Sequence, residues 1–328
     1  MSGWPRRGAD ERVRDNGPVN PAEIAAELAR LDLPSMPAPL PGRCIDDHTH
    51  VDSTADRSGL DAELNLAAAA AVGVDRLVQV GCDLDASRWA VRFAADHEQV
   101  AAAVAIHPND AARLAAAAGV DGLDDGIDRI AELAVAHERV RAVGETGLDY
   151  FRTRDEAGRA VQRRAFARHV RIAHDTGRTL VIHDRDAHAD VLRVLDEQGW
   201  PERTVLHCFS GDADFARAAL AGGAGRRDVW LSFGGAVTFK PNTALREALA
   251  VTPPDRLLVE TDAPYLTPVP LRGRPNAPYL LPVTVRFVAG ARGVDVDDEQ
   301  ALGRFCDRLT ANTLAAYGPW GARAGRGA

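Results

Sequence analysis

The chain has 328 residues, of which 46% are hydrophobic, so it is long enough to build one large domain or two small ones. Its net charge of −8 argues against the broad basic surface that binds duplex DNA, and any contact with nucleic acid must be local. No apolar run reaches the roughly 18 residues of a membrane span, and the N-terminus lacks the apolar core of a secretory signal. We therefore predict a cytoplasmic protein without membrane contact.

The cysteines are few and widely spaced, and none forms a C-x-x-C pair. This spacing does not suit a disulfide framework or a zinc ribbon. We therefore predict buried free thiols in a reducing compartment at all four positions, Cys44, Cys82, Cys208 and Cys306.

We predict that residues 1–41 form a proline-rich N-terminal extension. A short helix is predicted from Pro21 to Leu31, with Asn20 as its N-cap and proline at its first position. Four prolines between residues 34 and 41 then break the chain, which favours a tether or surface strap. The main domain is predicted over residues 42–318, followed by a flexible tail at 319–328.

Strand-like and helix-like segments alternate from residue 43 onward. Several strands are nearly continuous apolar runs, which is typical of strands buried on both faces. We predict strands at 43–47, 75–80, 100–106, 139–144, 178–182, 203–207, 228–233 and 256–260. We predict helices at 60–72, 85–97, 125–137, 156–176, 187–198, 212–222, 242–250, 279–292 and 297–316.

Eight such units favour a (β/α)8 TIM barrel over a doubly wound open sheet. Polar residues lie at or just after the ends of six predicted strands, and only a closed barrel brings six strand ends to one mouth. An open sheet would take ligand contacts from few strands. These residues are His48, His107, Glu145, His183, His207 and Asp262.

Histidines and carboxylates at one barrel mouth predict a metal centre. His48 and His50 are two residues apart in an extended segment, so both imidazoles can reach one ion. His183 and His207 end neighbouring strands and suit a second ion. Glu145 follows an apolar strand between glycines, and a carboxylate can bridge two cations. The chain's only lysine, Lys240, lies far from the fourth strand, where a carboxylated lysine bridges the ions in many two-metal barrel hydrolases.

Further polar residues near the predicted mouth suit catalysis and substrate binding. Asp262 follows the last strand, where it can serve as both metal ligand and general base. His107 also ends a strand and can reach the substrate, and the guanidinium of Arg185 can bind phosphate oxygens. Arg272 and Arg274 lie in the loop after the last strand. We assign the remaining five histidines to helix surfaces: His97, His137, His169, His174 and His188.

Several motifs in order resemble the TatD family of metal-dependent deoxyribonucleases, over about residues 44–316. They are Asp46–Asp52, Ile106–Pro108, Gly144–Tyr150, His183–Ala187, His207–Gly211, Ser232–Lys240, Glu260–Leu266 and Arg272–Pro278. The resemblance implies two divalent ions, Mg²⁺, Mn²⁺ or Zn²⁺. It assigns the first to His48, His50, Glu145 and Asp262, and the second to Glu145, His183 and His207. His107, Arg185, Arg274 and Asn276 would contact substrate phosphate, although the family often has lysine at position 274.

These observations predict phosphodiester hydrolysis by a metal-activated water, with Asp262 and Glu145 as catalytic residues. DNA ends are the favoured substrate, cleaved as by a 3′–5′ exonuclease, and we expect a monomer or weak oligomer. One alternative is an amidohydrolase that acts on a C–N or ester bond of a small molecule, because a fold does not fix its substrate. Another is a catalytically silent metal-binding scaffold, but that would predict the loss of at least one ligand type, and all six residues are present.

Overall fold

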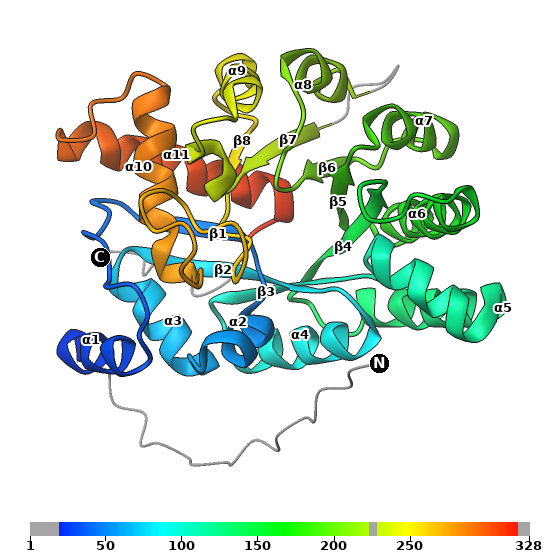
Figure 1. Cartoon of the computed structure of the whole chain (residues 1–328), viewed down its shortest axis with the longest axis horizontal. Coiled ribbons are helices and arrows are strands. Elements are labelled where there is room, and N and C mark those ends of the chain that lie inside the picture. Colours follow the sequence, from blue (N-terminus) through cyan, green and yellow to red (C-terminus); the bar gives the residue numbers. More distant parts are fainter. Residues whose placement is uncertain (1–19, 223–227, 321–328) are drawn as a thin grey trace, which may run out of the picture.

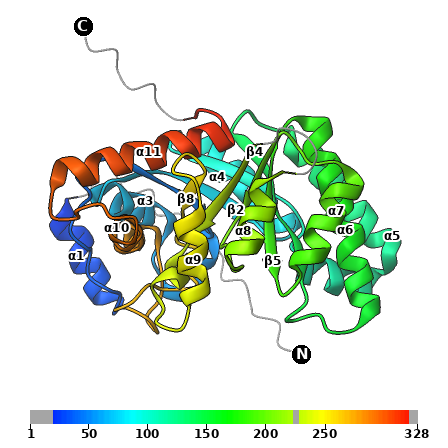
Figure 2. The same ribbon diagram turned by 90° about the horizontal axis from the view of Figure 1, so that it is seen from above.

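The computed structural model describes residues 20–222 and 228–320, and it confirms the predicted barrel. Eight parallel strands pair in chain order to form one sheet that curls around a central axis, with helices on its outside (Figure 1; Figure 2). The strands are β1 (Cys44–Thr49), β2 (Val74–Gly81), β3 (Val100–Val104), β4 (Val140–Asp149), β5 (Thr179–Arg185), β6 (Arg203–Leu206), β7 (Asp228–Phe233) and β8 (Leu257–Val259).

The last strand closes the barrel through the segment that follows it. The Asp262 backbone N–H donates to the carbonyl oxygen of His48 at 3.0 Å, and the His50 N–H donates to that of Ala263 at 2.9 Å. These bonds join the ends of β1 and β8, so the residues just past both strands are held side by side. The carboxyl ends of all eight strands therefore form one mouth.

The helices alternate with the strands largely as predicted. They are α1 (Pro21–Arg30), α2 (Val51–Ser58), α3 (Ala62–Ala71), α4 (Leu84–Asp96), α5 (Pro108–Ala134), α6 (Glu156–Thr176), α7 (His188–Gln198), α8 (Ala213–Leu220), α9 (Thr243–Val251), α10 (Leu281–Ala291) and α11 (Glu299–Tyr317), with short 3₁₀ turns at η1 (Gly235–Thr238) and η2 (Pro278–Leu280). None of the helices in the described ranges combines the length and apolar character of a membrane span.

Two helical segments were missed by the sequence prediction. Helix α2 was not predicted at all, and α5 begins 17 residues before the predicted start at 125. Gly119 leaves helical geometry at φ 76° inside α5, which explains why this region resembles a loop in sequence. The alanine-rich residues 111–118 before this glycine are nevertheless strong helix formers.

The end of α11 closes the bottom of the barrel, opposite the mouth. The interior is filled by small and branched side chains and Trp230 from the strands, together with Ala316, Tyr317 and Trp320. Thr179, at the start of β5, donates to the carbonyl of Ala316, and the Trp320 indole N–H donates to the carbonyl of Gln99 just before β3. Packing therefore extends past the predicted domain boundary at 318, and residues 321–328 of the predicted tail lie outside the described residues.

The described part of the N-terminal extension, residues 20–41, packs against the barrel. Helix α1 starts as predicted, with the Asn20 side chain accepting from the Ala22 N–H, and it buries Ile24 and Leu28. Beyond this helix, the Tyr279 hydroxyl donates to the carbonyl of Pro34 at 2.7 Å. This part of the extension is thus a strap across the barrel's outer layer, and residues 1–19 lie outside the described ranges.

His169 corrects one histidine assignment. It was predicted to lie on a helix surface, but it is fully buried on the inner face of α6. Its Nε2 accepts from the backbone N–H of Ile106 at 3.1 Å, and its Nδ1 lies 2.7 Å from the carbonyl of Ala165. The imidazole therefore satisfies a buried backbone donor directly before the predicted substrate residue His107.

We expect His169 to make the fold sensitive to acid. Burial lowers the pKa of His169 to about 4, whereas an unfolded chain binds the proton near pH 6.5. Because the pKa of His169 is lower in the folded state, the unfolded chain takes up the proton first as the pH falls. The free energy of unfolding is therefore unaffected by His169 above pH 6.5 and decreases by about 2 to 3 kcal/mol as the pH falls towards 4. In urea unfolding, His169→Gln should gain stability relative to the wild type between pH 7.5 and 4.5. A difference that stays constant with pH would contradict this.

Candidate metal centre

The structure brings the six predicted metal ligands together at the mouth of the barrel. All but one are buried below a tenth of their surface, and His183 is partly buried. They come from β1 or its end, β4, β5 and the segments directly after β6 and β8: His48, His50, Glu145, His183, His207 and Asp262. Their place on the strands explains the convergence, because parallel barrel strands all point their carboxyl ends to one face.

Glu145 lies at the middle of the cluster and divides it into two halves. Its Oε1 is 3.7 Å from His48 Nε2 and 3.4 Å from His50 Nε2. Its Oε2 is 3.1 Å from His183 Nδ1 and 2.8 Å from His207 Nε2. Asp262 belongs to the first half, with Oδ1 3.5 Å from His50 Nε2. Each oxygen of one carboxylate therefore faces its own pair of imidazoles.

Close backbone contact between β4 and β5 permits this arrangement. Gly147 has a φ of 134°, and a Cβ at this position would lie 2.1 Å from the carbonyl oxygen of His183. A side chain at 147 would push the two strands apart. The glycine thus lets Glu145 and His183 approach each other.

The cluster is electrostatically coupled. Burial alone would raise the pKa of Glu145, but the imidazoles of His207 and His183 hold this pKa well below its usual range. Burial opposes the charging of His207 as well, yet Glu145 and Glu260 raise the pKa of His207 well above its ordinary value. Glu145 is therefore ionised, and this buried negative charge favours a positive charge nearby.

The chemistry of the donor atoms fits divalent cations. Both ring nitrogens of His48 and both carboxylate oxygens of Glu260 are buried without a hydrogen-bond partner. Buried polar atoms are rarely left unpaired, and unpaired imidazole nitrogens beside ionised carboxylates are what a metal ion requires. Within residues 20–222 and 228–320, three groups hold their donor atoms within 4.8 Å of one another: His48, His50 and Glu145; His48, His207 and Glu260; and His107, Glu145 and His183.

Surrounding groups orient the imidazoles. His50 Nδ1 lies 2.9 Å from the carbonyl oxygen of Val80, so that Nε2 points into the cluster. His183 Nε2 lies 3.5 Å from Asp149 Oδ2, which also accepts from the side-chain amide of Asn109. Asp149 therefore contacts the site through Oδ2 and stabilises its own turn through Oδ1, which accepts from the Arg152 N–H.

Glu260 and Cys82 extend the site beyond the six predicted ligands. Glu260 is completely buried, with Oε1 3.5 Å from His207 Nδ1. The Cys82 thiol, directly after β2, donates to Glu145 Oε1 at 3.3 Å. The sequence carried the signal for Cys82, since it too follows an apolar strand, but we interpreted it only as a free thiol. The structure shows all four cysteines free, with Cys44 and Cys306 fully buried.

We expect Glu260→Gln to weaken metal binding about 10- to 100-fold, because this carboxylate faces the ring nitrogen of His207 that points away from Glu145. An amide would remove the negative charge that raises the basicity of the imidazole. Calorimetric titration of metal into metal-free protein measures this effect. Glu247→Gln, at an exposed position of α9, is the control, and equal affinities for the two variants would refute the role of Glu260.

Asp46 holds the segment after β8 in place. Its carboxylate accepts from the backbone N–H and the hydroxyl of Thr261 at 2.9 and 2.6 Å. Asp46 lies two residues before His48, and Thr261 lies one residue before Asp262. This contact therefore holds the segment after β8 against β1. Burial raises the pKa of Asp46 to about 8.

The four predicted substrate residues occupy different surroundings. His107 lies at the edge of the cluster, with Nε2 3.8 Å from Glu145 Oε2. Arg185 lies over the ring of Phe151, with Cζ 4.0 Å from the ring centroid. The Arg274 guanidinium donates to the backbone and side chain of Asp32 in the strap. Asn276 is buried, and its amide donates to the carbonyls of Thr261 and Tyr265. The structure thus places His107 and Arg185 at the mouth, and engages Arg274 and Asn276 in contacts within the chain.

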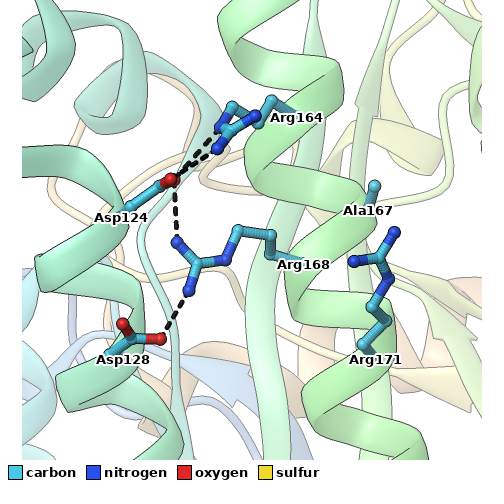
Figure 3. Close-up of a pocket in the computed structure, with 6 residues that line it drawn as sticks. All are labelled: Asp124, Asp128, Arg164, Ala167, Arg168 and Arg171. Carbon is cyan, nitrogen blue, oxygen red and sulfur yellow. Dashed lines mark hydrogen bonds and ion pairs between the residues drawn. The ribbon is translucent and has the colours of Figure 1, made fainter. Parts of the chain in front are cut away.

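A second depression lies outside the barrel, between α5 and α6. Its charged side chains pair with one another, as Arg164 does with Asp124, and Arg168 with both Asp124 and Asp128 (Figure 3). Arginines that already pair with aspartates bind an anionic ligand poorly, and no histidine or thiol lines this depression. The barrel mouth is therefore the candidate functional site.

Comparison with known proteins agrees with the fold and identifies the family. A family model described as TatD related DNase matches residues 45–307. A Mycobacterium tuberculosis protein named as a metal-dependent hydrolase TatD is 45% identical over 249 residues, which cover 75% of this chain and 89% of that protein. A Cronobacter sakazakii protein named 3′-5′ ssDNA/RNA exonuclease TatD is 35% identical over 243 residues, or 72% and 86% of the two chains.

A solved structure has the same architecture. The crystal structure of a TatD homologue from Escherichia coli matches with a TM-score of 0.73 at 23% identity, covering 85% of this chain and all of the other. At this identity the likeness shows the fold, while the family model and the two relatives extend over most of the sequence. The chain therefore belongs to the family of TatD-related DNases.

Proposed function

We propose that the protein is a divalent-metal-dependent hydrolase that cleaves phosphodiester bonds at the ends of DNA strands, in the manner of a 3′–5′ exonuclease. The observation that carries this proposal is the position of Glu145, whose two oxygens each face a separate pair of imidazoles. A carboxylate between two such groups suits a pair of cations, and paired cations are typical of enzymes that transfer or hydrolyse phosphate esters.

In this proposal His48, His50, Glu145 and Asp262 would hold one ion, and Glu145, His183 and His207 would hold the other. Bound Mg²⁺, Mn²⁺ or Zn²⁺ would make a water molecule more acidic and neutralise charge on the phosphate. Asp262 is buried, and its contact with His50 keeps its pKa below the usual value despite that burial. Asp262 is therefore an ionised carboxylate that can orient the attacking water and accept its proton.

The chain's own cations would bind the substrate. Arg185 follows His183 by two residues, and its guanidinium makes no hydrogen bond or ion pair with any residue in the described ranges. Burial lowers the pKa of His107 to about 3, so this imidazole is neutral and can donate or accept a hydrogen bond near the phosphate. Arg274 and Asn276 would join them only after leaving their present contacts.

The named relative and the charge of the chain both support a strand end as substrate. The Cronobacter protein is named as an exonuclease of single-stranded DNA and RNA. A net charge of −8 suits an enzyme that draws one terminus into a local site better than one that grips a long duplex. The expected monomeric or weakly associated state is compatible with such a site, because all the proposed ligands come from one chain.

A substrate panel tests this proposal. The metal-loaded protein should shorten 5′-labelled single-stranded DNA from its 3′ end, and should hydrolyse a set of amides and lactones far more slowly. Hydrolysis of an amide or lactone without any shortening of DNA would reverse the assignment in favour of a small-molecule amidohydrolase. Protein with His48→Ala serves as the inactive control in every assay.

A further inference from the structure

Two aromatic rings are exposed beside the metal centre. Phe151 and Tyr265 have 46% and 45% of their surface exposed, and the other strongly exposed large apolar residues in the described ranges are all valines. Aromatic rings normally bury most of their area, because each removes a large apolar surface from water. Two rings left open at one mouth therefore need an explanation.

Both rings belong to loops that leave the metal-binding strands. Phe151 follows Asp149, the last residue of β4, by two positions, and Asp149 contacts His183. Tyr265 follows Asp262 by three positions, and its ring centroid lies 6.2 Å from that of His50 at an angle of 71°. The two rings thus flank the two halves of the cluster around Glu145.

Each ring carries an arginine without an acidic partner. Arg185 lies over Phe151, and Arg57 lies over Tyr265 with Cζ 5.3 Å from the ring centroid. Neither guanidinium forms a hydrogen bond or ion pair with another described residue, whereas Arg163, behind the same loop, pairs with Glu156 and Asp190. An arginine that lies over a ring without an acidic partner keeps its N–H groups available for phosphate oxygens.

We propose that the Phe151–Arg185 and Tyr265–Arg57 pairs are nucleotide-binding platforms that select unpaired strand ends. In each pair the ring stacks against a base while the arginine binds a neighbouring phosphate. Bases of a duplex are already stacked and paired, so they cannot reach the rings, whereas every unpaired base offers a free face. The proposal rests on the proposed function and adds the residues that would set its preference for single strands.

A comparison of two matched single-stranded DNA substrates isolates the contribution of the bases. One is a 5′-labelled single strand, and the other has the same length and phosphates but lacks the bases of its three 3′-terminal nucleotides. We expect Phe151→Ala and Tyr265→Ala each to lower kcat/KM about ten-fold on the intact strand, with little change on the abasic strand. Phe151→Trp should restore activity, because tryptophan keeps a stacking surface.

Val135→Ala is the control, because this exposed valine follows α5 at the opposite end of the barrel from the mouth. Metal content and thermal unfolding should match the wild type in all variants. Equal losses on the intact and abasic strands, or no loss on either, would overturn the platforms and leave the nuclease proposal standing. A wild-type protein that degrades neither strand would instead overturn both proposals, so the two failures are distinguishable.

Discussion

Glu145→Ala is expected to abolish hydrolysis and to lower bound metal below that of the wild type. This carboxylate contacts the imidazoles of both halves of the site, so its loss removes a ligand from each proposed ion at once. Metal ions contribute several kcal/mol of transition-state stabilisation, and kcat should therefore fall about a thousand-fold or more. Metal analysis of the purified variant, together with single-turnover hydrolysis of labelled DNA, measures both effects.

The matched control is Glu138→Ala, an exposed glutamate just before the opposite end of β4. It should retain wild-type metal content and rate. Because removing a buried carboxylate among histidines can also disturb folding, Glu145→Gln provides a second variant with nearly the same shape. Wild-type rate and full metal content in Glu145→Gln would rule out the bridging role.

Asp262→Asn is expected to lower kcat by about two to four orders of magnitude, the usual contribution of a general base. Its Oδ1 lies 3.5 Å from His50 Nε2, and His50 and the other imidazoles keep it ionised. Asparagine retains a ligand oxygen but accepts no proton. The backbone of Asp262 is left-handed, at φ 51°, a conformation that asparagine tolerates as well, so the fold should be preserved.

Steady-state kinetics separate this effect from a loss of binding. KM should change little, because an interaction that acts mainly in the transition state lowers kcat and kcat/KM together. Asp255→Asn, an exposed aspartate before β8, should behave as the wild type. A raised KM with unchanged kcat in Asp262→Asn would show that Asp262 binds substrate and takes no part in the chemical step.

The sequence predicted the barrel and the convergence of the candidate ligands because both follow from strand ends. Apolar runs mark strands buried on both faces, and a polar residue directly after such a run must lie at the mouth of a parallel barrel. His48 and Glu145 lie in two separate strands and Asp262 lies just after a third, and their chain order placed them in one cluster, as the structure shows. Their role as metal ligands stays a prediction.

The sequence could not predict contacts that depend on side-chain direction or on the paths of loops. Asp46 and Glu260 both lie near the ends of strands, but only the structure shows that Asp46 binds Thr261 while Glu260 faces His207. Arg274 contacts Asp32, which lies 242 residues earlier, and no local pattern records such a meeting. His169 appeared to be a surface residue because α6 is rich in arginine, and a single buried polar position does not alter that pattern.

Titration of a divalent metal into chelator-treated protein tests the two-metal account most directly, with shortening of 5′-labelled single-stranded DNA as the readout. The metal-free protein should be inactive, and activity should rise until two ions are bound per chain, consistent with the two faces of Glu145. Full hydrolysis by the metal-free protein, or a maximum reached with one ion bound, would contradict the account.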